Sequence, residues 1–454
     1  MDEIDKFRQD VINSDTFCFY PFLELSTNPA GHVKPCCYYG QVLFKNPNVK
    51  SFDNVYSISN GDTFEDVWNS NAMLDIRKKM TVGERINACK TCYRDGDASM
   101  RVRSIREYKN NITILQSVKE TIDSDYTAQH LPKRLELKPS NLCNLKCMMC
   151  NSYDSSQVAK EIQALAEEYG GVTVDVGRFI KINIENPGIT ESNGDFASVD
   201  VPDWSENKSV WESFIKTVPH LETLSFAGGE PTLIPFVENA LRHCVDTGHA
   251  KHIDVFLSSN FTNLNKSFLE MMPKFKKFEL IASIDGIGKV NDYCRFPSKW
   301  SQISDNFKKA RQLMVHSNVK ILINISVNLL NVFNLDELLF WIDEQSTSYP
   351  YYKEWPYNLN LIWGPKEMRV EVLPEAIRLE AIKRLENYKK TSTVLKEFPQ
   401  LTEKVDLIIS QLLVEDTQSA RNLEQFKYRV KILDKHREIS ISDFIPALKE
   451  IFNE

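Results

Sequence analysis

Two patterns of hydrophobic residues alternate along the middle of the chain. Short apolar runs, typical of buried parallel strands, are each followed by a longer segment whose apolar residues have helical spacing. Six strand-then-helix units are predicted, with strands at 134–138, 223–226, 253–258, 278–284, 320–327 and 359–363 and helices at 155–169, 236–245, 266–272, 304–315, 335–344 and 374–388. This repeat predicts an α/β fold with a parallel sheet, in which ligand-binding loops follow the carboxyl ends of the strands.

The regions on either side of the repeat have other patterns. Residues 19–26 and 31–36 predict a hairpin that turns at 28–31, and the segment beyond Tyr388 predicts helices of mixed charge. We therefore expect three regions, which are a small N-terminal α+β module at 1–110, a strand–helix domain at 130–375 and a helical C-terminal region at 376–454.

Two further segments are less specific. In the helical C-terminal region we identify no site, and we expect Asp434 and Arg437 to be structural partners. Residues 172–207 are rich in Gly, Asn, Asp and Ser and are too long for an ordinary loop between a strand and a helix. An insertion that covers a substrate and a plain surface insertion both fit this segment.

Composition sets the class of protein. The 454 residues are 42% hydrophobic and 26% charged, which is typical of a globular chain of roughly two to three domains. The net charge of −7 disfavours a dedicated nucleic-acid-binding protein, since such proteins neutralise phosphates with Lys and Arg. No apolar segment approaches the roughly 20 residues of a membrane span, and the N-terminus lacks the pattern of a signal peptide. We expect a cytoplasmic protein with no membrane partner, in which thiols stay reduced.

Ten cysteines are unevenly placed in the chain. Three lie in the sequence Cys143-Asn-Leu-Lys-Cys147-Met-Met-Cys150, in a polar loop after the first predicted strand. A closed zinc or iron–sulfur site takes four protein ligands, so three thiolates suit a cubane cluster with one iron left open. Buried core cysteines and a zinc site with a distant fourth ligand are the alternatives. We expect Cys244 and Cys294, which stand alone, to be packed or free thiols.

Five more cysteines lie near the N-terminus. Cys89-Lys-Thr-Cys92 forms one pair, and Cys18 and the doublet Cys36-Cys37 precede it. Four thiolates in a pairwise arrangement suit either zinc or an iron–sulfur cluster, and their spacing alone does not decide between the two.

Polar motifs follow three of the predicted strands. They comprise a Gly-Gly turn through which backbone can approach a ligand closely, polar side chains at two strand ends, and an arginine suited to a carboxylate. The residues are Gly228, Gly229 and Glu230; Ser258 and Asn260; and Ser283, Asp285 and Arg295. Taken singly, each motif also fits an ordinary turn or a surface salt bridge.

The Cys-x3-Cys-x2-Cys loop, with these three motifs in order behind it, resembles the radical S-adenosylmethionine (SAM) enzymes. The resemblance implies a partial (β/α)6 TIM-like barrel, in which Cys143, Cys147 and Cys150 hold a [4Fe–4S] core cluster whose open iron binds SAM. It also implies which part of SAM each motif contacts. The methionine amino group is bound by Gly228, Gly229 and Glu230, and the ribose or carboxylate by Ser258 and Asn260. The methionine carboxylate is approached by Ser283 and Arg295, while Asp285 orients the loop. Met149 stands where the family commonly has an aromatic residue near the adenine, and its thioether can fill that space.

The N-terminal cysteines also resemble a known module. Their pattern is similar to that of the twitch domain, a shorter relative of the SPASM domain. The residues that form the pattern are Cys18, Gly31, Cys36, Cys89 and Cys92. The resemblance implies an auxiliary [4Fe–4S] cluster on these four cysteines. Cys36 is favoured over Cys37 as a ligand because its sequence distance from Gly31 fits the module. In this chain the module precedes the barrel, whereas in the family the module usually follows the barrel. With four cysteine ligands no iron is open, which favours electron transfer over substrate binding.

The resemblance also implies an activity. The expected enzyme is oxidoreductase-like: it cleaves SAM reductively to a 5′-deoxyadenosyl radical, which abstracts hydrogen from a substrate C–H bond, with the electron supplied by a flavodoxin- or ferredoxin-like donor. We expect a peptide or protein substrate, and oxidation of a small molecule such as an aminocyclitol is the alternative. Outside enzymes, basic clusters at 77–79 and 101–106 suggest a metal-binding scaffold or a nucleic-acid-binding module. No catalytic acid or base can be nominated from the sequence.

Overall fold

The chain forms two compact units. The structure is a computed structural model that describes residues 3–46, 48, 54–96, 99–168, 175–176, 179–180, 201, 203–315, 318–347 and 356–452. Unit 1 comprises Met1–Ser140, Val201–Leu257 and Lys274–Lys277, and unit 2 comprises Asn141–Asp200, Ser258–Pro273 and Phe278–Glu454.

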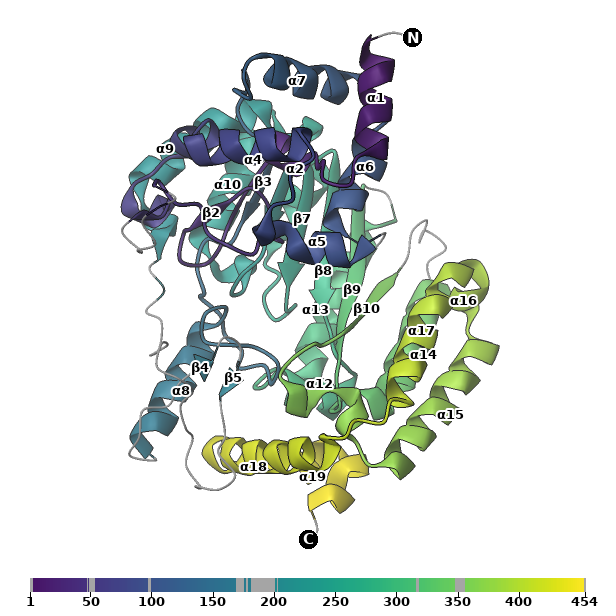
Figure 1. Ribbon diagram of the computed structural model, residues 1–454. Helices are drawn as coiled ribbons and strands as arrows, with labels where there is room; N and C mark the ends of the chain where they lie inside the picture. Colours follow the sequence, from purple (N-terminus) through teal and green to yellow (C-terminus); the bar gives the residue numbers. More distant parts are fainter. Residues whose placement is uncertain are drawn as a thin grey trace. The chain divides into compact units, whose positions relative to one another are not determined.

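Unit 1 contains a mainly parallel sheet, visible in Figure 1. Its strands, in spatial order, are β7 (Asp254–Ser259), β6 (Thr223–Phe226), β3 (Arg134–Leu137), β1 (Glu24–Thr27) and β2 (Val33–Lys34), of which the last is antiparallel to its neighbour. Leu25, Leu135, Leu224 and Val255 lie opposite one another across four strands, and all are buried. This row fixes the register, because a slip of one residue would turn each side chain to the other face.

The helices of unit 1 lie before β3 and around β6. They are α1 (Glu3–Asn13), α2 (Tyr20–Leu23), α3 (Phe64–Trp68), α4 (Asn71–Thr81), α5 (Lys90–Arg94), α6 (Met100–Tyr108), α7 (Ile112–Asp123), α9 (Lys208–Thr217) and α10 (Pro235–Asp246). The predicted hairpin forms between β1 and β2, around a turn in which the Gly31 N–H donates to the carbonyl of Asn28 at 2.9 Å. The predicted first strand, 19–26, is wrong over residues 20–23, which form α2, and right over 24–26, which lie in β1. Pro21 suits the start of that helix because its φ is already helical.

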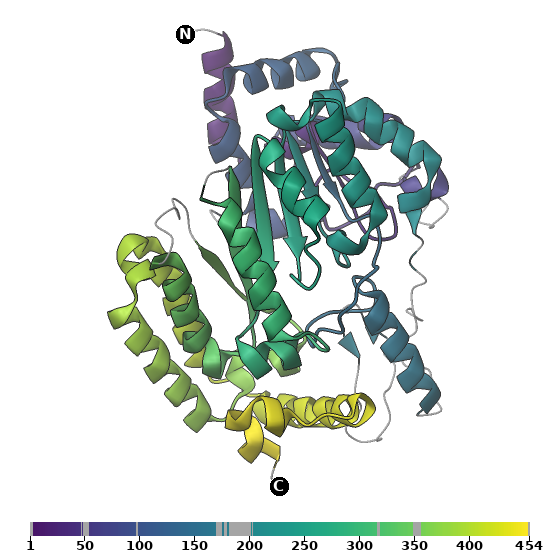
Figure 2. The same cartoon turned by 180° about the vertical axis from the view of Figure 1, so that it is seen from behind.

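Unit 2 contains three parallel strands and most of the C-terminal helices. The strands are β8 (Lys277–Ser283), β9 (Val319–Val327) and β10 (Tyr357–Leu361), with β9 in the centre. The helices are α8 (Ser156–Glu168), α11 (Lys266–Met271), α12 (Gly288–Cys294), α13 (Trp300–Leu313), α14 (Leu335–Thr347), α15 (Glu375–Thr391), α16 (Thr393–Glu397), α17 (Thr402–Leu412), α18 (Ser419–Arg437) and α19 (Ile441–Phe444). The view from behind in Figure 2 shows α13 against the strand layer, where it packs on β9.

The six predicted strand–helix units are all present, and their ends agree to within a few residues. The α/β class with mostly parallel strands is therefore confirmed. Strand β1 pairs in parallel with β3, with Glu24 opposite Arg134, which the sequence did not predict. Through this pairing the N-terminal region extends the sheet that contains the first predicted strand. The division at 1–110, 130–375 and 376–454 stays a prediction.

Two sequence expectations concern segments outside these elements. Most of the expected insertion at 172–207 lies outside the described residues, and its described part includes a short antiparallel pair, β4 (Asp175–Val176) and β5 (Phe179–Ile180). Among the described helices, none combines the length and the apolar character that a membrane crossing requires.

Candidate functional site

The four N-terminal cysteines predicted to hold a cluster line a single cavity in unit 1. Cys18, Cys36, Cys89 and Cys92 are all buried, and the remaining wall is largely aromatic and apolar. Cys18 lies just before α2 and Cys36 just after β2, whereas Cys89 and Cys92 are three residues apart on one helical face, where side chains are neighbours. Segments far apart in the chain therefore deliver four sulfur donors to one place.

Burial controls the ionisation of these thiols. It raises the pKa of Cys18 to about 11 and that of Cys89 to about 12, and it raises the pKa of Cys36 well above its usual value. The other thiolates add to the effect, since charge on Cys92 opposes charge on Cys18 and charge on Cys18 opposes charge on Cys36. Four thiolates in one cavity would need a compensating positive group, which an iron–sulfur cluster would supply.

Cys37 has a different environment from Cys36. Burial and the carboxylates of Glu136 and Glu24 raise its pKa, and its thiol is hydrogen-bonded with Glu136 on β3. Among the described residues that line the cysteine cavity, Cys36 is present and Cys37 is not. This placement supports the prediction that Cys36 is the ligand.

Arg77 on α4 holds the framework beside this cavity. It is fully buried and donates hydrogen bonds to the carbonyls of Pro21 at 2.8 Å, Trp68 at 2.9 Å and Tyr126 at 2.9 Å, and to the side-chain oxygen of Asn69 at 3.0 Å. The guanidinium also lies 4.5 Å from the Trp68 ring centroid, a cation–π distance. Arg77 was part of a basic cluster suggestive of nucleic-acid binding, and its burial removes it from any such surface.

The three-cysteine loop lies in unit 2. Cys143 is buried, and Cys147 and Cys150 are half-buried. The loop pairs like a strand with residues 294–296: the Lys146 N–H donates to the Phe296 carbonyl at 2.6 Å, and the Met148 N–H to the Cys294 carbonyl at 2.8 Å. Burial raises the pKa of Cys147 to about 12, and the charge of Arg295 acts in the opposite direction. The loop thus has a fixed backbone, with a cation beside its central cysteine.

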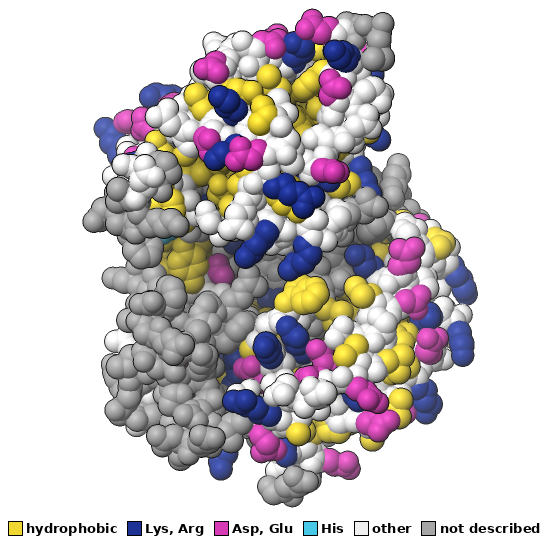
Figure 3. Space-filling model, in the orientation of Figure 1, with side chains coloured by type: hydrophobic (Ala, Val, Ile, Leu, Met, Phe, Trp, Pro, Cys, Tyr) yellow, Lys and Arg dark blue, Asp and Glu magenta, His cyan; other side chains and the backbone are white. Residues whose placement is uncertain are grey.

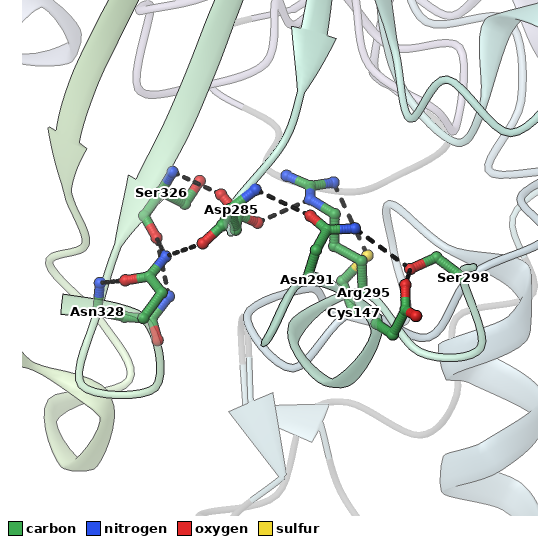
Figure 4. Close-up of polar contacts among 9 residues, drawn as sticks. Cys147, Asp285, Asn291, Arg295, Ser298, Ser326 and Asn328 are labelled. Carbon is green, nitrogen blue, oxygen red and sulfur yellow. Dashed lines mark hydrogen bonds and ion pairs between the residues drawn. The ribbon is translucent and has the colours of Figure 1, made fainter. Parts of the chain in front are cut away.

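Asp285 and Arg295 form a buried ion pair next to Cys147, which Figure 4 shows. The Arg295 Nε lies 2.7 Å from Asp285 Oδ2, and Arg295 Nη1 lies 4.0 Å from the Cys147 sulfur. The other carboxylate oxygen of Asp285 accepts from the Ser326 N–H at 2.7 Å, and the Asp285 carbonyl accepts from the side chain of Asn331 at 2.9 Å. Asp285 therefore fixes the direction of the Arg295 guanidinium, and its predicted role of orienting the loop stays a prediction.

Asn260 fastens the cysteine loop to the turn after β7. Its Nδ2 donates to Asn144 Oδ1 at 2.9 Å, and its Oδ1 accepts from both the backbone N–H and the hydroxyl of Thr262. Asn144, which lies between Cys143 and Cys147, closes the network by donating to the Thr262 hydroxyl at 2.8 Å. The side chain predicted to contact SAM thus supports the three-cysteine loop, and the SAM contact itself stays a prediction. Sequence reasoning missed Asn144, whose role depends on a partner 116 residues away.

The Gly-Gly turn lies in unit 1, immediately after β6. Gly228 and Gly229 have φ angles of +78° and +53°, and a Cβ on Gly228 would lie 2.8 Å from the Cβ of Lys138. Glu230 is fully buried and caps the 3-10 turn at 231–233, since its Oε1 accepts from the N–H and the hydroxyl of Thr232. The turn therefore presents bare backbone, as expected, while the Glu230 side chain also has a local structural partner.

The remaining predicted residues lie near two strand ends and in the cysteine loop of unit 2. Ser258 and Ser283 are half-buried at the carboxyl ends of β7 and β8, and Met149 is half-buried in the cysteine loop. Within the ranges that the structure describes, no three Cys, His, Asp or Glu side chains are arranged to hold a metal ion directly.

Comparison with known proteins adds one finding about sequence and several about structure. Residues 18–93 match the family model of SPASM, an iron-sulfur cluster-binding domain. The match contains all four cysteines of the unit 1 cavity, in the region where an auxiliary cluster was predicted. Whether the module is of the shorter twitch type stays a prediction. No curated protein matches the chain.

Several solved structures are similar to the chain at low identity. Native anSMEcpe with bound AdoMet is 17% identical with a TM-score of 0.35, over 57% of this chain and 60% of that chain. Streptococcus suis SuiB bound to precursor peptide SuiA is 15% identical with a TM-score of 0.34, over 73% of this chain and 64% of that chain. TYW1 with a lysine-pyruvate adduct bound is 14% identical with a TM-score of 0.27, over 56% and 72%. The matches thus span less than two thirds of the anSMEcpe and SuiB chains.

Proposed function

We propose that this chain is a radical SAM enzyme with two [4Fe–4S] clusters. Cys143, Cys147 and Cys150 hold the core cluster, and Cys18, Cys36, Cys89 and Cys92 hold an auxiliary cluster. The observation that carries the proposal is the cavity of unit 1, where four cysteines from separate segments converge inside the region that matches an iron–sulfur domain. The three-cysteine loop, with one ligand fewer than a closed site, supplies the complementary open cluster.

The chain's own residues bind and orient the reactants. A cluster held by Cys143, Cys147 and Cys150 would supply the chemistry of reductive SAM cleavage, with its electron coming from a flavodoxin- or ferredoxin-like donor and hydrogen being removed from a substrate carbon. Arg295, fixed by Asp285, places a positive charge where a thiolate and the SAM carboxylate need one. The Gly228–Gly229 backbone offers its polar groups to the methionine amino group, and Asn260 keeps the cysteine loop in place.

We assign the substrate to the class of peptides or proteins, as the resemblance to SPASM-type enzymes implies. A nucleic-acid partner is disfavoured by charge. On the face shown in Figure 3, Lys and Arg side chains are interspersed with Asp and Glu over the described residues, and the net charge is −7. Phosphate binding depends on neutralisation by Lys and Arg, which the acidic net charge disfavours.

Metal analysis and SAM cleavage test the proposal together. Anaerobically reconstituted protein should hold about eight irons per chain, as two cubane clusters require, and should release 5′-deoxyadenosine when dithionite is added. The Cys143→Ala/Cys147→Ala/Cys150→Ala variant should lose cleavage and keep about four irons. Cys244→Ala, which removes a buried cysteine that stands alone, is the matched control and should behave like the unaltered protein. Two zinc ions and no cleavage would refute the proposal.

The substrate class needs its own experiment. Deuterium from a labelled peptide pool should appear in 5′-deoxyadenosine, whereas a labelled pool of small polyols should transfer none. The reverse result would assign the enzyme to small molecules and leave the cluster assignment intact.

A further inference from the structure

Helix α18 binds the backbone of the three-cysteine loop. Arg437 donates from Nη2 to the carbonyl of Lys146 at 2.9 Å, and Arg429 donates from Nη2 to the carbonyl of Met148 at 2.8 Å. These two carbonyls belong to the residues on either side of Cys147. Both arginine side chains are buried, so their hydrogen bonds lie in a low-dielectric environment where they are electrostatically stronger than in water.

Arg437 is itself held by a carboxylate on α8. Its Nε lies 2.8 Å from Glu161 Oε1 and its Nη2 lies 2.6 Å from Glu161 Oε2, an arrangement that engages both carboxylate oxygens. Burial favours the neutral form of Glu161, but the hydrogen bonds and the charge of Arg437 outweigh it and lower the carboxyl pKa. The pair therefore stays charged and fixes the guanidinium plane, with one nitrogen directed at the Lys146 carbonyl. The same guanidinium lies 5.0 Å from the Phe296 ring centroid.

The same helix also supports the segment that pairs with the loop. Asp434 on α18 accepts a hydrogen bond from the Tyr293 hydroxyl at 2.7 Å, and Tyr293 directly precedes Cys294, whose carbonyl binds the Met148 N–H. The loop is thus bound on two sides: its N–H groups donate to residues 294–296, and its carbonyls accept from α18. Both contacts lie within unit 2.

We infer that α18 is a clamp on the three-cysteine loop, in which Arg437 and Arg429 are positioning residues that fix the backbone around Cys147 and place positive charge beside it. As far as it concerns a cluster, this inference rests on the proposed function and deepens it, because hydrogen bonds and charge near the sulfurs set the potential of an iron–sulfur cluster. The contacts that hold the loop are made by the chain's own residues.

Hydrogen exchange in the full, cluster-free chain tests the clamp directly. Arg437→Met should accelerate exchange of the Lys146 and Met148 amides at least tenfold. The reason is that the substitution removes the hydrogen bond from Arg437 to the Lys146 carbonyl, which holds the loop in place. Arg421→Met, on an exposed part of the same helix, is the matched control and should change neither amide. The Arg437→Met/Glu161→Gln variant avoids leaving a buried charge unpaired, and amides of β9 report any general unfolding of unit 2. Unchanged exchange at Lys146 and Met148 would overturn the inference.

A second readout concerns the cluster. In a Cys89→Ala/Cys92→Ala background without the auxiliary cluster, Arg437→Met should shift the midpoint potential of the core cluster to more negative values and alter its electron paramagnetic resonance spectrum. Arg437→Lys should restore the potential in part, since it keeps the charge. An unchanged potential and spectrum in Arg437→Met would refute the electrostatic part of the inference. A chain that binds no core cluster at all would refute the proposed function, while the exchange result would still decide the clamp.

Discussion

Gly228 offers a test of how tightly the Gly-Gly turn is packed. Its φ of +78° is almost that of Gly248, at +77°, but their surroundings differ. A Cβ on Gly228 would lie 2.8 Å from Lys138 Cβ and 3.1 Å from Lys138 Cγ, whereas a Cβ on Gly248 would meet nothing within 4 Å. The Lys138 Cβ is attached to the backbone at the end of β3, so it cannot swing away as the end of a flexible side chain could.

The two alanine variants therefore share one cost and differ in another. Left-handed backbone costs a residue with a Cβ about 1–2 kcal/mol, and overpacking typically adds about 1–3 kcal/mol. We expect Gly248→Ala to lower the free energy of unfolding by about 1–2 kcal/mol and Gly228→Ala by about 2–5 kcal/mol. The gain from a less flexible unfolded chain is the same for both and cancels in the comparison.

Urea unfolding followed by tryptophan fluorescence measures this difference. Gly228→Ala should unfold at a lower urea concentration than Gly248→Ala, with the same dependence on urea. Lys138→Gly should relieve the contact, so it should destabilise the Gly228→Ala protein less than it destabilises the unaltered protein. Equal midpoints for the two alanine variants would refute the reasoning, because the contact with Lys138 is the difference between them.

Three further predictions follow from buried charges. Arg77→Met leaves several carbonyls without a donor, so it should lower the free energy of unfolding by at least about 3 kcal/mol. It should also lower the iron content of the auxiliary site. Lys78→Met, at an exposed neighbouring position, should change neither quantity. Burial raises the pKa of Glu24 to about 7, so the native state keeps a proton that the unfolded state releases above its ordinary pKa near 4.5, and stability falls as the pH rises between these values. Glu24→Gln should flatten that pH profile in urea titrations; an unchanged slope would contradict it. Asp285→Asn leaves Arg295 buried without its anion, so it should lower the free energy of unfolding by about 3–5 kcal/mol, as measured by thermal or urea unfolding. SAM cleavage should be lost as well. A variant as stable as the unaltered protein would contradict this prediction.

The sequence predicted what depends on local pattern. Apolar periodicity located all six strand–helix units, because each strand must bury its side chains and each helix one face. The resemblance of the N-terminal cysteine pattern to a known iron–sulfur module implied which thiols would meet, and these four line one cavity. The short helix α2 was missed because residues 20–23 are apolar throughout, and such a run does not distinguish strand from helix. The pairing of β1 with β3 was missed because it joins residues 110 positions apart, and no local signal records a partner.

The supports of the cysteine loop show why the rest of the site could not be predicted. Residues 143–150 form no helix or strand, so the loop's position depends on bonds to other segments. Asn260 holds it from 116 residues away and Arg429 from 281 residues away, and both are ordinary polar residues in their own local sequence. Fixing an irregular loop costs roughly 1–2 kcal/mol of conformational entropy per residue, which these distant contacts must offset. We therefore expect the packing of α18 on the loop to order the three cysteines. Core-cluster assembly should consequently follow the folding of unit 2, so during refolding Arg437→Met should delay iron uptake by the core site more than by the auxiliary site.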